Sequence, residues 1–171
     1  AIPIYDITYN VAMNIRSLVA SGLGALVPEV SRQSVLAASG LERIRHIYLR
    51  TIKIISLIGI PSFLAVFIMA TPLLQIWLQE RFVSLLPAAL RIMLIGAFLN
   101  LFAIPAYYTL MGLGLTNRLF FFNFVKSGVN LAVIMLVVSA TASLSINAIA
   151  WATFTGMACS TAFVMWQNQK V

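Results

Sequence analysis

The stretch IKIISLIGIPSFLAVFIMATPLLQIWL, Ile52–Leu78, decides the fold of this chain. No charged residue falls between Ile54 and Leu78. An α-helix needs about 20 mostly apolar residues to cross the hydrocarbon core of a bilayer. The stretch is therefore long enough and apolar enough to span a membrane.

The composition of the whole chain agrees with this interpretation. Of its 171 residues, 61% are hydrophobic and 9% are charged, and the mean hydropathy is +1.00. An average soluble domain is about 45–50% apolar and about 25% charged. The composition excludes a disordered chain, a disulfide framework and a soluble nucleic-acid-binding protein. It predicts an integral membrane protein whose partner is the lipid bilayer.

Four further segments are candidate spans. We place the five spans at about 4-27, 52-78, 83-113, 119-138 and 146-166. The third is longer than a bilayer requires, so we expect it to tilt, to kink near Pro105 or to project from the membrane. The sequence predicts an all-α fold, a polytopic membrane helix bundle of about five transmembrane helices that forms one domain over residues 1-171.

The charges between the spans predict the orientation. One side of the membrane collects the basic residues from Arg32 to Lys53, Arg118 and Lys170, whereas the other has Asp6, Glu80 and Arg81. Basic loops stay in the cytoplasm, so we expect the N-terminus outside and the C-terminus inside. The formal net charge of +7 then reflects this bias rather than an anionic partner such as nucleic acid.

The connection over about 33-51 has an amphipathic pattern. Ser39 to Glu42 reads S-G-L-E, which fits a capping box at the start of a helix. Apolar residues then share one side and basic residues the other. We expect an amphipathic helix that anchors on the inner leaflet and runs into the second span; a specific docking role is the alternative.

The residues that carry most enzyme chemistry are scarce. The chain has one cysteine, Cys159, one histidine, His46, and four acidic residues. The metalloprotease pattern HExxH, the phosphate-binding loop and the CxxC pair are all missing from the sequence. We therefore expect no catalytic residues, no metal site and no cofactor, and the chain is not expected to be an enzyme.

The first span carries a polar stripe that lipid would not favour. Its members fall within about 80° of helix arc and are Asp6, Asn10, Asn14, Ser17, Ser21 and Gly24. Arg16 stands off this stripe, nearer Tyr5 and Tyr9. Ionisable residues inside spans cost several kcal/mol and usually face a cavity or a partner.

The fourth span repeats the pattern with Asn123, Lys126, Ser127 and Asn130 on one face. The spacing favours a hydrated cavity, with snorkelling of Lys126 to the inner interface as the alternative. In the third span, Asn100 belongs to a weakly polar stripe that close helix packing explains equally well.

Arg16 and Lys126 share their two spans with a single acid, Asp6. If both face one cavity, it is electropositive, and the arginine fork suits a phosphate. The alternative is that Arg16 pairs with Asp6 or with an acid on another helix. The candidate cavity-lining residues are Asp6, Asn10, Asn14, Arg16, Ser17, Asn100, Asn123, Lys126 and Asn130.

Four stretches of the chain resemble the MOP (multidrug/oligosaccharidyl-lipid/polysaccharide) exporter superfamily, in particular the bacterial polysaccharide (O-antigen type) flippases. These stretches are LGALVPEVSR at Leu23–Arg32, SGLERIRHIYLRTIKIISLIGIPSFL at Ser39–Leu64, ATPLLQIWLQERF at Ala70–Phe82, and LRIMLIGAFLNLFAIPAYYTLMGLGLTN at Leu90–Asn117. Each motif is short and apolar, so the specificity of the resemblance lies in their order and spacing.

The resemblance implies a transporter of lipopolysaccharide or O-antigen biosynthesis in the bacterial plasma (inner) membrane. Such a flippase moves an undecaprenyl-diphosphate-linked oligosaccharide from the inner to the outer leaflet by alternating access between two lobes. The chain is similar to the last five helices of a twelve-helix core. We therefore expect a fragment, the partial C-terminal lobe of a two-lobe flippase, whose partners are the missing N-terminal lobe and the lipid-linked anionic oligosaccharide. The alternative is a chain that needs a separate partner chain.

Other functions remain open at this stage. A MATE-type drug/cation antiporter has the same fold but favours acidic residues in its cavity. A lipid-precursor flippase of peptidoglycan synthesis is a related possibility. In a non-transporting membrane subunit, the polar stripes would face protein instead of water.

Reporter fusions test the predicted orientation. Fusions after Gln33 and after Arg118 are expected to report the cytoplasm, and a fusion after Arg81 the outside, because the basic connections resist translocation. The measurement is the ratio of periplasmic to cytoplasmic reporter activity. A periplasmic signal from the Gln33 fusion would overturn the orientation.

Overall fold

The computed structural model describes residues 2–34, 37–141 and 145–168. Within them, five helical segments are long and apolar enough to cross a membrane: Tyr5–Gln33, Glu42–Ile68, Leu86–Gly112, Thr116–Ser139 and Ile146–Asn168. Helices form these segments because lipid offers no hydrogen bonds to the backbone, so each span must satisfy its own amides. The predicted all-α polytopic bundle is confirmed.

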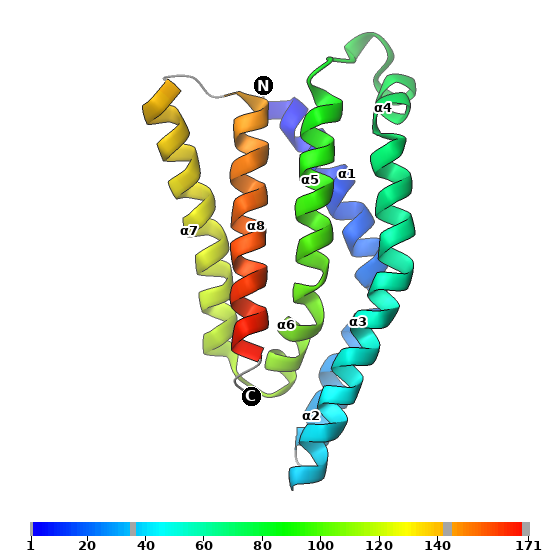
Figure 1. Ribbon diagram of the computed structural model, residues 1–171, viewed down its shortest axis with the longest axis vertical. Coiled ribbons are helices and arrows are strands. Elements are labelled where there is room, and N and C mark those ends of the chain that lie inside the picture. The colour runs from blue at the N-terminus through cyan, green and yellow to red at the C-terminus, as the bar shows by residue number, and fades with distance from the viewer. Residues whose placement is uncertain (1, 35–36, 142–144, 169–171) are drawn as a thin grey trace.

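The elements follow one another as an up-and-down bundle (Figure 1). They are α1 (Ile2–Ala20), a 3-10 turn (Ser21–Ala25), α2 (Leu26–Ser34), α3 (Ala37–Ile68), α4 (Ala70–Leu78), a 3-10 turn (Gln79–Arg81), α5 (Leu86–Leu101), α6 (Ala103–Gly112), α7 (Thr116–Thr141) and α8 (Ile146–Asn168). The two ends of the chain lie at opposite ends of the bundle (Figure 1).

Two of the spans are interrupted just before a proline. The third span breaks at Phe102, three residues before Pro105, and the second breaks at Met69, three residues before Pro72. A proline has no backbone N–H and its ring clashes with the carbonyl of the preceding turn, so the helix bends there. Of the three expectations for the long third span, which were tilt, a kink near Pro105 or projection from the membrane, the interruption at Phe102 fits the kink.

Pro61 behaves differently, because α3 continues through it without a break. The next residue, Ser62, donates its hydroxyl to the Ile58 carbonyl at 2.8 Å. The first span, predicted as one helix, instead contains the 3-10 turn Ser21–Ala25. Its sequence, SGLGA, has two glycines, and glycine weakens a helix interior.

The amphipathic helix expected over about 33-51 runs into the second span, as predicted, because both belong to α3. This helix runs without interruption from Ala37 to Ile68, so the predicted cap Ser39 lies inside it. Its 32 residues span about 48 Å at 1.5 Å per residue, which exceeds the roughly 30 Å hydrocarbon core. The basic segment therefore continues the axis of the span, and the adjoining ends of α2 and α3 project beyond α6 and α8 (Figure 1).

Small residues bring the helices together. A Cβ on Gly156 of α8 would lie 2.7 Å from the Lys126 carbonyl oxygen and 3.2 Å from the Asn130 Cβ of α7. A Cβ on Gly96 of α5 would lie 3.3 Å from the Phe154 Cα of α8. Glycine at these positions permits close backbone approach, which drives helix association in membranes. α8 thus packs against both α5 and α7.

Replacing Gly156 with alanine is expected to push α7 away from α8. The added methyl group overlaps a backbone carbonyl, and overpacking typically costs about 1–3 kcal/mol. We expect a lower midpoint of thermal unfolding in detergent.

Gly128→Ala is the matched control. Gly128 lies in α7, and a Cβ there would meet nothing within 4 Å. Helix propensity alone then favours alanine by up to about 1 kcal/mol. Equal destabilisation by both variants would contradict the packing role of Gly156.

Candidate functional site

A cavity of about 390 Å³ lies between α1, the α5–α6 region and α7. The cavity lies beside the helix break at Phe102, since its lining includes Asn100 before the break and Ala103 after it. The lining comprises Arg16, Ser17, Ala20, Asn100, Ala103, Ile104, Tyr107, Tyr108, Phe122, Asn123 and Lys126. A helix break in a membrane protein is a common place for a binding site, because irregular backbone there can line a cavity.

Both intramembrane cations proposed from the sequence line this cavity. Arg16 and Lys126 are half-buried, and their positive charges repel each other electrostatically. The Nε of Arg16 is buried without a hydrogen-bond partner in the described part of the chain. The lining contains no carboxylate, so its charged groups are all positive.

Arg16 is not paired with Asp6 in the described residues, where the one ion pair joins Arg32 and Glu29. Both Arg16 and Asp6 belong to α1, and ten residues of helix separate them by about 15 Å along the axis. Side chains cannot bridge that distance in this conformation. The repulsion between Arg16 and Lys126 is therefore not offset by Asp6.

Hydrogen bonds fix the polar side chains around the cations. Asn100 is buried and donates its Nδ2 to the Thr161 Oγ1 of α8 at 3.2 Å. Asn123 donates to the Leu119 carbonyl, one turn earlier in α7, at 3.3 Å. These contacts hold two amides beside the cavity and tie its wall to α8.

The other candidate residues lie outside the cavity lining. Asp6, Asn10 and Asn14 are exposed on α1. Asn130 donates to the Thr153 Oγ1 at 3.0 Å, and the same oxygen lies 2.9 Å from the Tyr5 hydroxyl. This network joins α7, α8 and α1, so Asn130 holds helices together.

Two tyrosines of the lining, Tyr107 and Tyr108, are absent from the residues proposed from the sequence. Tyr107 is seven residues after Asn100 and belongs to the same weakly polar stripe of the third span, which close helix packing explained equally well. Tyr108, the next residue of α6, lies off that stripe, so the spacing does not indicate it.

Arg91 is a further cation that the sequence reasoning missed. It lies in α5, outside the cavity lining. Its Nε lies 3.4 Å from the Phe67 carbonyl and its Nη2 lies 3.3 Å from the Thr71 Oγ1. A charged residue inside a predicted span indicates in itself that the side chain faces a cavity or a partner.

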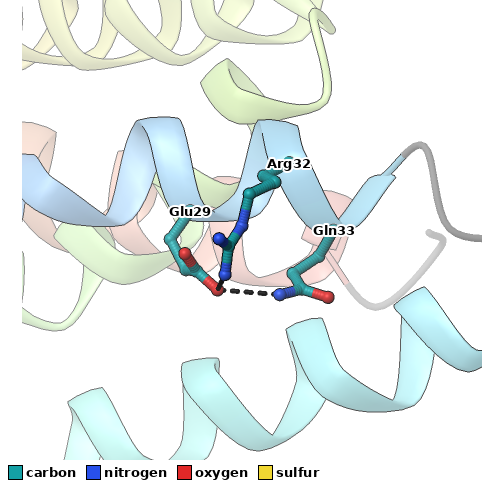
Figure 2. A network of polar contacts seen from close by, with 3 residues as sticks. All are labelled: Glu29, Arg32 and Gln33. Atoms are coloured by element: carbon teal, nitrogen blue, oxygen red, sulfur yellow. Dashed lines mark hydrogen bonds and ion pairs between the residues drawn. The ribbon is translucent and has the colours of Figure 1, made fainter.

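A polar cluster near the basic end of the bundle is a surface feature and not part of the cavity (Figure 2). Arg32 and Glu29 form an ion pair at 3.3 Å, and Gln33 donates to the same carboxylate oxygen at 2.8 Å. The Arg32 side chain is 74% exposed, and ion pairs of this kind contribute little stability. Its effect is to neutralise one of the cations at this end.

Comparison with known proteins adds one finding. No curated protein and no solved structure matches the chain. The MatE family model matches residues 4–136, which include nearly all of α1, all of α2 to α6, most of α7 and all of the cavity lining. MatE members are membrane transporters rather than enzymes, and the family lies within the MOP superfamily. With most of its length matched, this multi-pass membrane chain belongs to the MatE family of exporters.

Proposed function

We propose that the chain forms the phosphate-binding wall of a flippase that moves an undecaprenyl-diphosphate-linked oligosaccharide from the inner to the outer leaflet. The observation that supports this most is the presence of Arg16 and Lys126 in one cavity whose lining has no carboxylate. An unpaired cation in a membrane needs water, an acid or an anionic ligand. A diphosphate would neutralise both cations at once.

The shape and chemistry of the cavity suit part of such a substrate. Its volume of about 390 Å³ lies at the lower end of the range for small-molecule sites. That space accommodates a diphosphate and the adjoining sugar, whereas the remaining sugars and the polyprenyl chain would lie outside it. The arginine fork binds two phosphate oxygens, and the lysine supplies a point charge.

The exposed polar face of α1 supports a water-filled passage. Asn10, Asn14 and Ser17 are all exposed, and lipid would leave their polar groups without partners. We infer that this face meets water between the chain and a second set of helices, the N-terminal lobe of the same transporter. Rocking of two such lobes about the cavity would expose it alternately to each side.

The position of the cavity fits uptake from the basic end. Lys126 is eight residues beyond Arg118, or about 12 Å of helix rise. By the positive-inside rule this end is cytoplasmic, with the N-terminus outside. A substrate captured from the inner leaflet of the bacterial inner membrane would then carry its phosphate less than half of the way across the bilayer to reach Lys126.

A drug/cation antiporter is the alternative that the family match accommodates equally well. On this chain it would depend on Asp6, the one carboxylate of the exposed polar face of α1. Substitutions of Asp6 and of the two cations therefore separate the two functions.

Arg16→Ala and Lys126→Ala are each expected to abolish glycan export by the complete transporter, because each removes half of the charge that binds the diphosphate. Arg16→Lys should lower export by at least about tenfold, since losing one charge-assisted hydrogen bond is worth about 1.5–3 kcal/mol. The measurements are surface glycan and membrane abundance for each variant.

Arg45→Ala is the matched control, because Arg45 is an exposed cation near the N-terminal end of α3 and does not line the cavity. It should leave export unchanged. Normal export by both alanine variants would refute the phosphate site. Loss of cation-coupled drug efflux in Asp6→Asn, with efflux retained in Arg16→Ala, would establish the antiporter instead.

Thiol labelling tests whether the cavity is hydrated and electropositive. In a Cys159→Ser background, Ser17→Cys and Asn123→Cys should react with a membrane-impermeant methanethiosulfonate. An anionic reagent should react several-fold faster than a cationic one, because Arg16 and Lys126 concentrate anions.

Leu57→Cys is the control for this labelling. Leu57 is 78% exposed on the apolar side of α3 and should face lipid, so a charged reagent should not reach it. Inert thiols at positions 17 and 123 would instead support a non-transporting subunit whose polar faces are covered by protein.

A further inference from the structure

An apolar groove of about 280 Å³ lies between α3 and α5, outside the cavity described above. Its lining is Ile60, Phe63, Leu64, Phe67, Leu94, Ile95 and Phe98. Several of these side chains are exposed, with Leu64 at 55% and Ile95 at 46%. In a membrane-spanning chain, such a surface meets hydrocarbon.

A guanidinium lies at one end of this groove. Arg91 is three and four residues before Leu94 and Ile95, so it shares their face of α5, one turn nearer the helix start. Its Cζ lies 5.7 Å from the centroid of the Phe67 ring, which lines the groove. Phe67 is therefore both part of the groove wall and the contact of the cation.

The hydrogen bonds of Arg91 leave its charge unneutralised. It donates to a carbonyl and a hydroxyl, on Phe67 and Thr71, at 3.4 and 3.3 Å, which are long for such bonds. A guanidinium has five N–H donors. Within the described residues Arg91 has no acidic partner, and its remaining donors are not enclosed by the bundle.

The depth of Arg91 matches a lipid headgroup. It is five residues after Leu86, the first residue of α5, or about 7.5 Å along the helix. Trp77 near the end of α4, at the same end of the bundle (Figure 1), is 59% exposed. Exposed tryptophans mark the membrane interface.

We propose that the α3–α5 groove binds an anionic glycerophospholipid, with an acyl chain along the apolar wall and the lipid phosphate on Arg91 and Thr71. Charge complementarity selects this occupant. A neutral apolar helix would fill the groove but leave the guanidinium unpaired, and a soluble anion would pair with Arg91 but leave the groove empty. A phospholipid satisfies both, whatever substrate the cavity of Arg16 and Lys126 transports.

Native mass spectrometry of the delipidated, purified chain in detergent tests this proposal. The probes are palmitoyl-oleoyl phosphatidylglycerol and its phosphatidylcholine counterpart. The wild type should prefer phosphatidylglycerol, and Arg91→Gln should reduce that preference by about tenfold, the lower end for hydrogen bonds to a charged group. Arg91→Lys should retain part of it, because the charge remains.

The groove wall is tested separately. Ile95→Trp fills the groove and should lower binding of both lipids, whereas Leu57→Trp, on an exposed position of α3 outside the groove, should not. Arg45→Gln is the control for charge, since it removes an exposed cation elsewhere on α3.

Three results would overturn the proposal. In one, Arg91→Gln leaves the lipid preference unchanged but lowers the unfolding temperature in both lipids. Arg91 would then stabilise the packing of α3 on α5 without binding lipid. Another is full displacement of phosphatidylglycerol by glycerol phosphate, which would remove the role of the groove. The last is displacement by undecaprenyl phosphate at equal concentration, which would assign the groove to a transported lipid.

Discussion

Hydrocarbon cannot solvate a charge or a backbone amide, and the arrangement of this chain depends on that constraint. It makes every span helical, and it constrains where Arg16, Lys126 and Arg91 are tolerated. Arg16 and Lys126 line a cavity with polar walls, whereas Arg91 lies near a helix start against a carbonyl, a hydroxyl and an aromatic ring. The same constraint thus produces two chemically different sites.

α8 holds together α5 and α7, which form walls of the cavity, and its described part carries no charged residue. It packs on α5 and α7 through contacts at Gly96 and Gly156, and it accepts the hydrogen bonds of Asn100 and Asn130. Two walls of the cavity are therefore held to one central helix. α1, which supplies Arg16, has fewer polar ties to that centre, and its hydrogen bond through Tyr5 lies far from the cavity.

Hydropathy predicted the five spans, and Pro105 marked one place where a span is interrupted, because both signals depend on local sequence. The break at Met69 and the continuity of α3 through Pro61 were not predictable in the same way, since two prolines in one span behave differently according to their surroundings. The polar faces of separate helices offered a shared cavity for Arg16 and Lys126 as one of two alternatives, and close helix packing explained the stripe of Asn100 equally well. Tyr108 lies off the stripe of Asn100, so the sequence pattern did not indicate its place in the lining.

The contact at Gly156 also restricts how this sequence can evolve. The neighbour of Gly156 is a backbone carbonyl, that of Lys126, and no change of side chain can withdraw it. Gly59, in contrast, faces a methyl group of Leu101 at 3.0 Å, which a smaller residue would remove. Among descendants of this chain, position 59 should therefore vary together with position 101, whereas position 156 should remain glycine whatever happens around it.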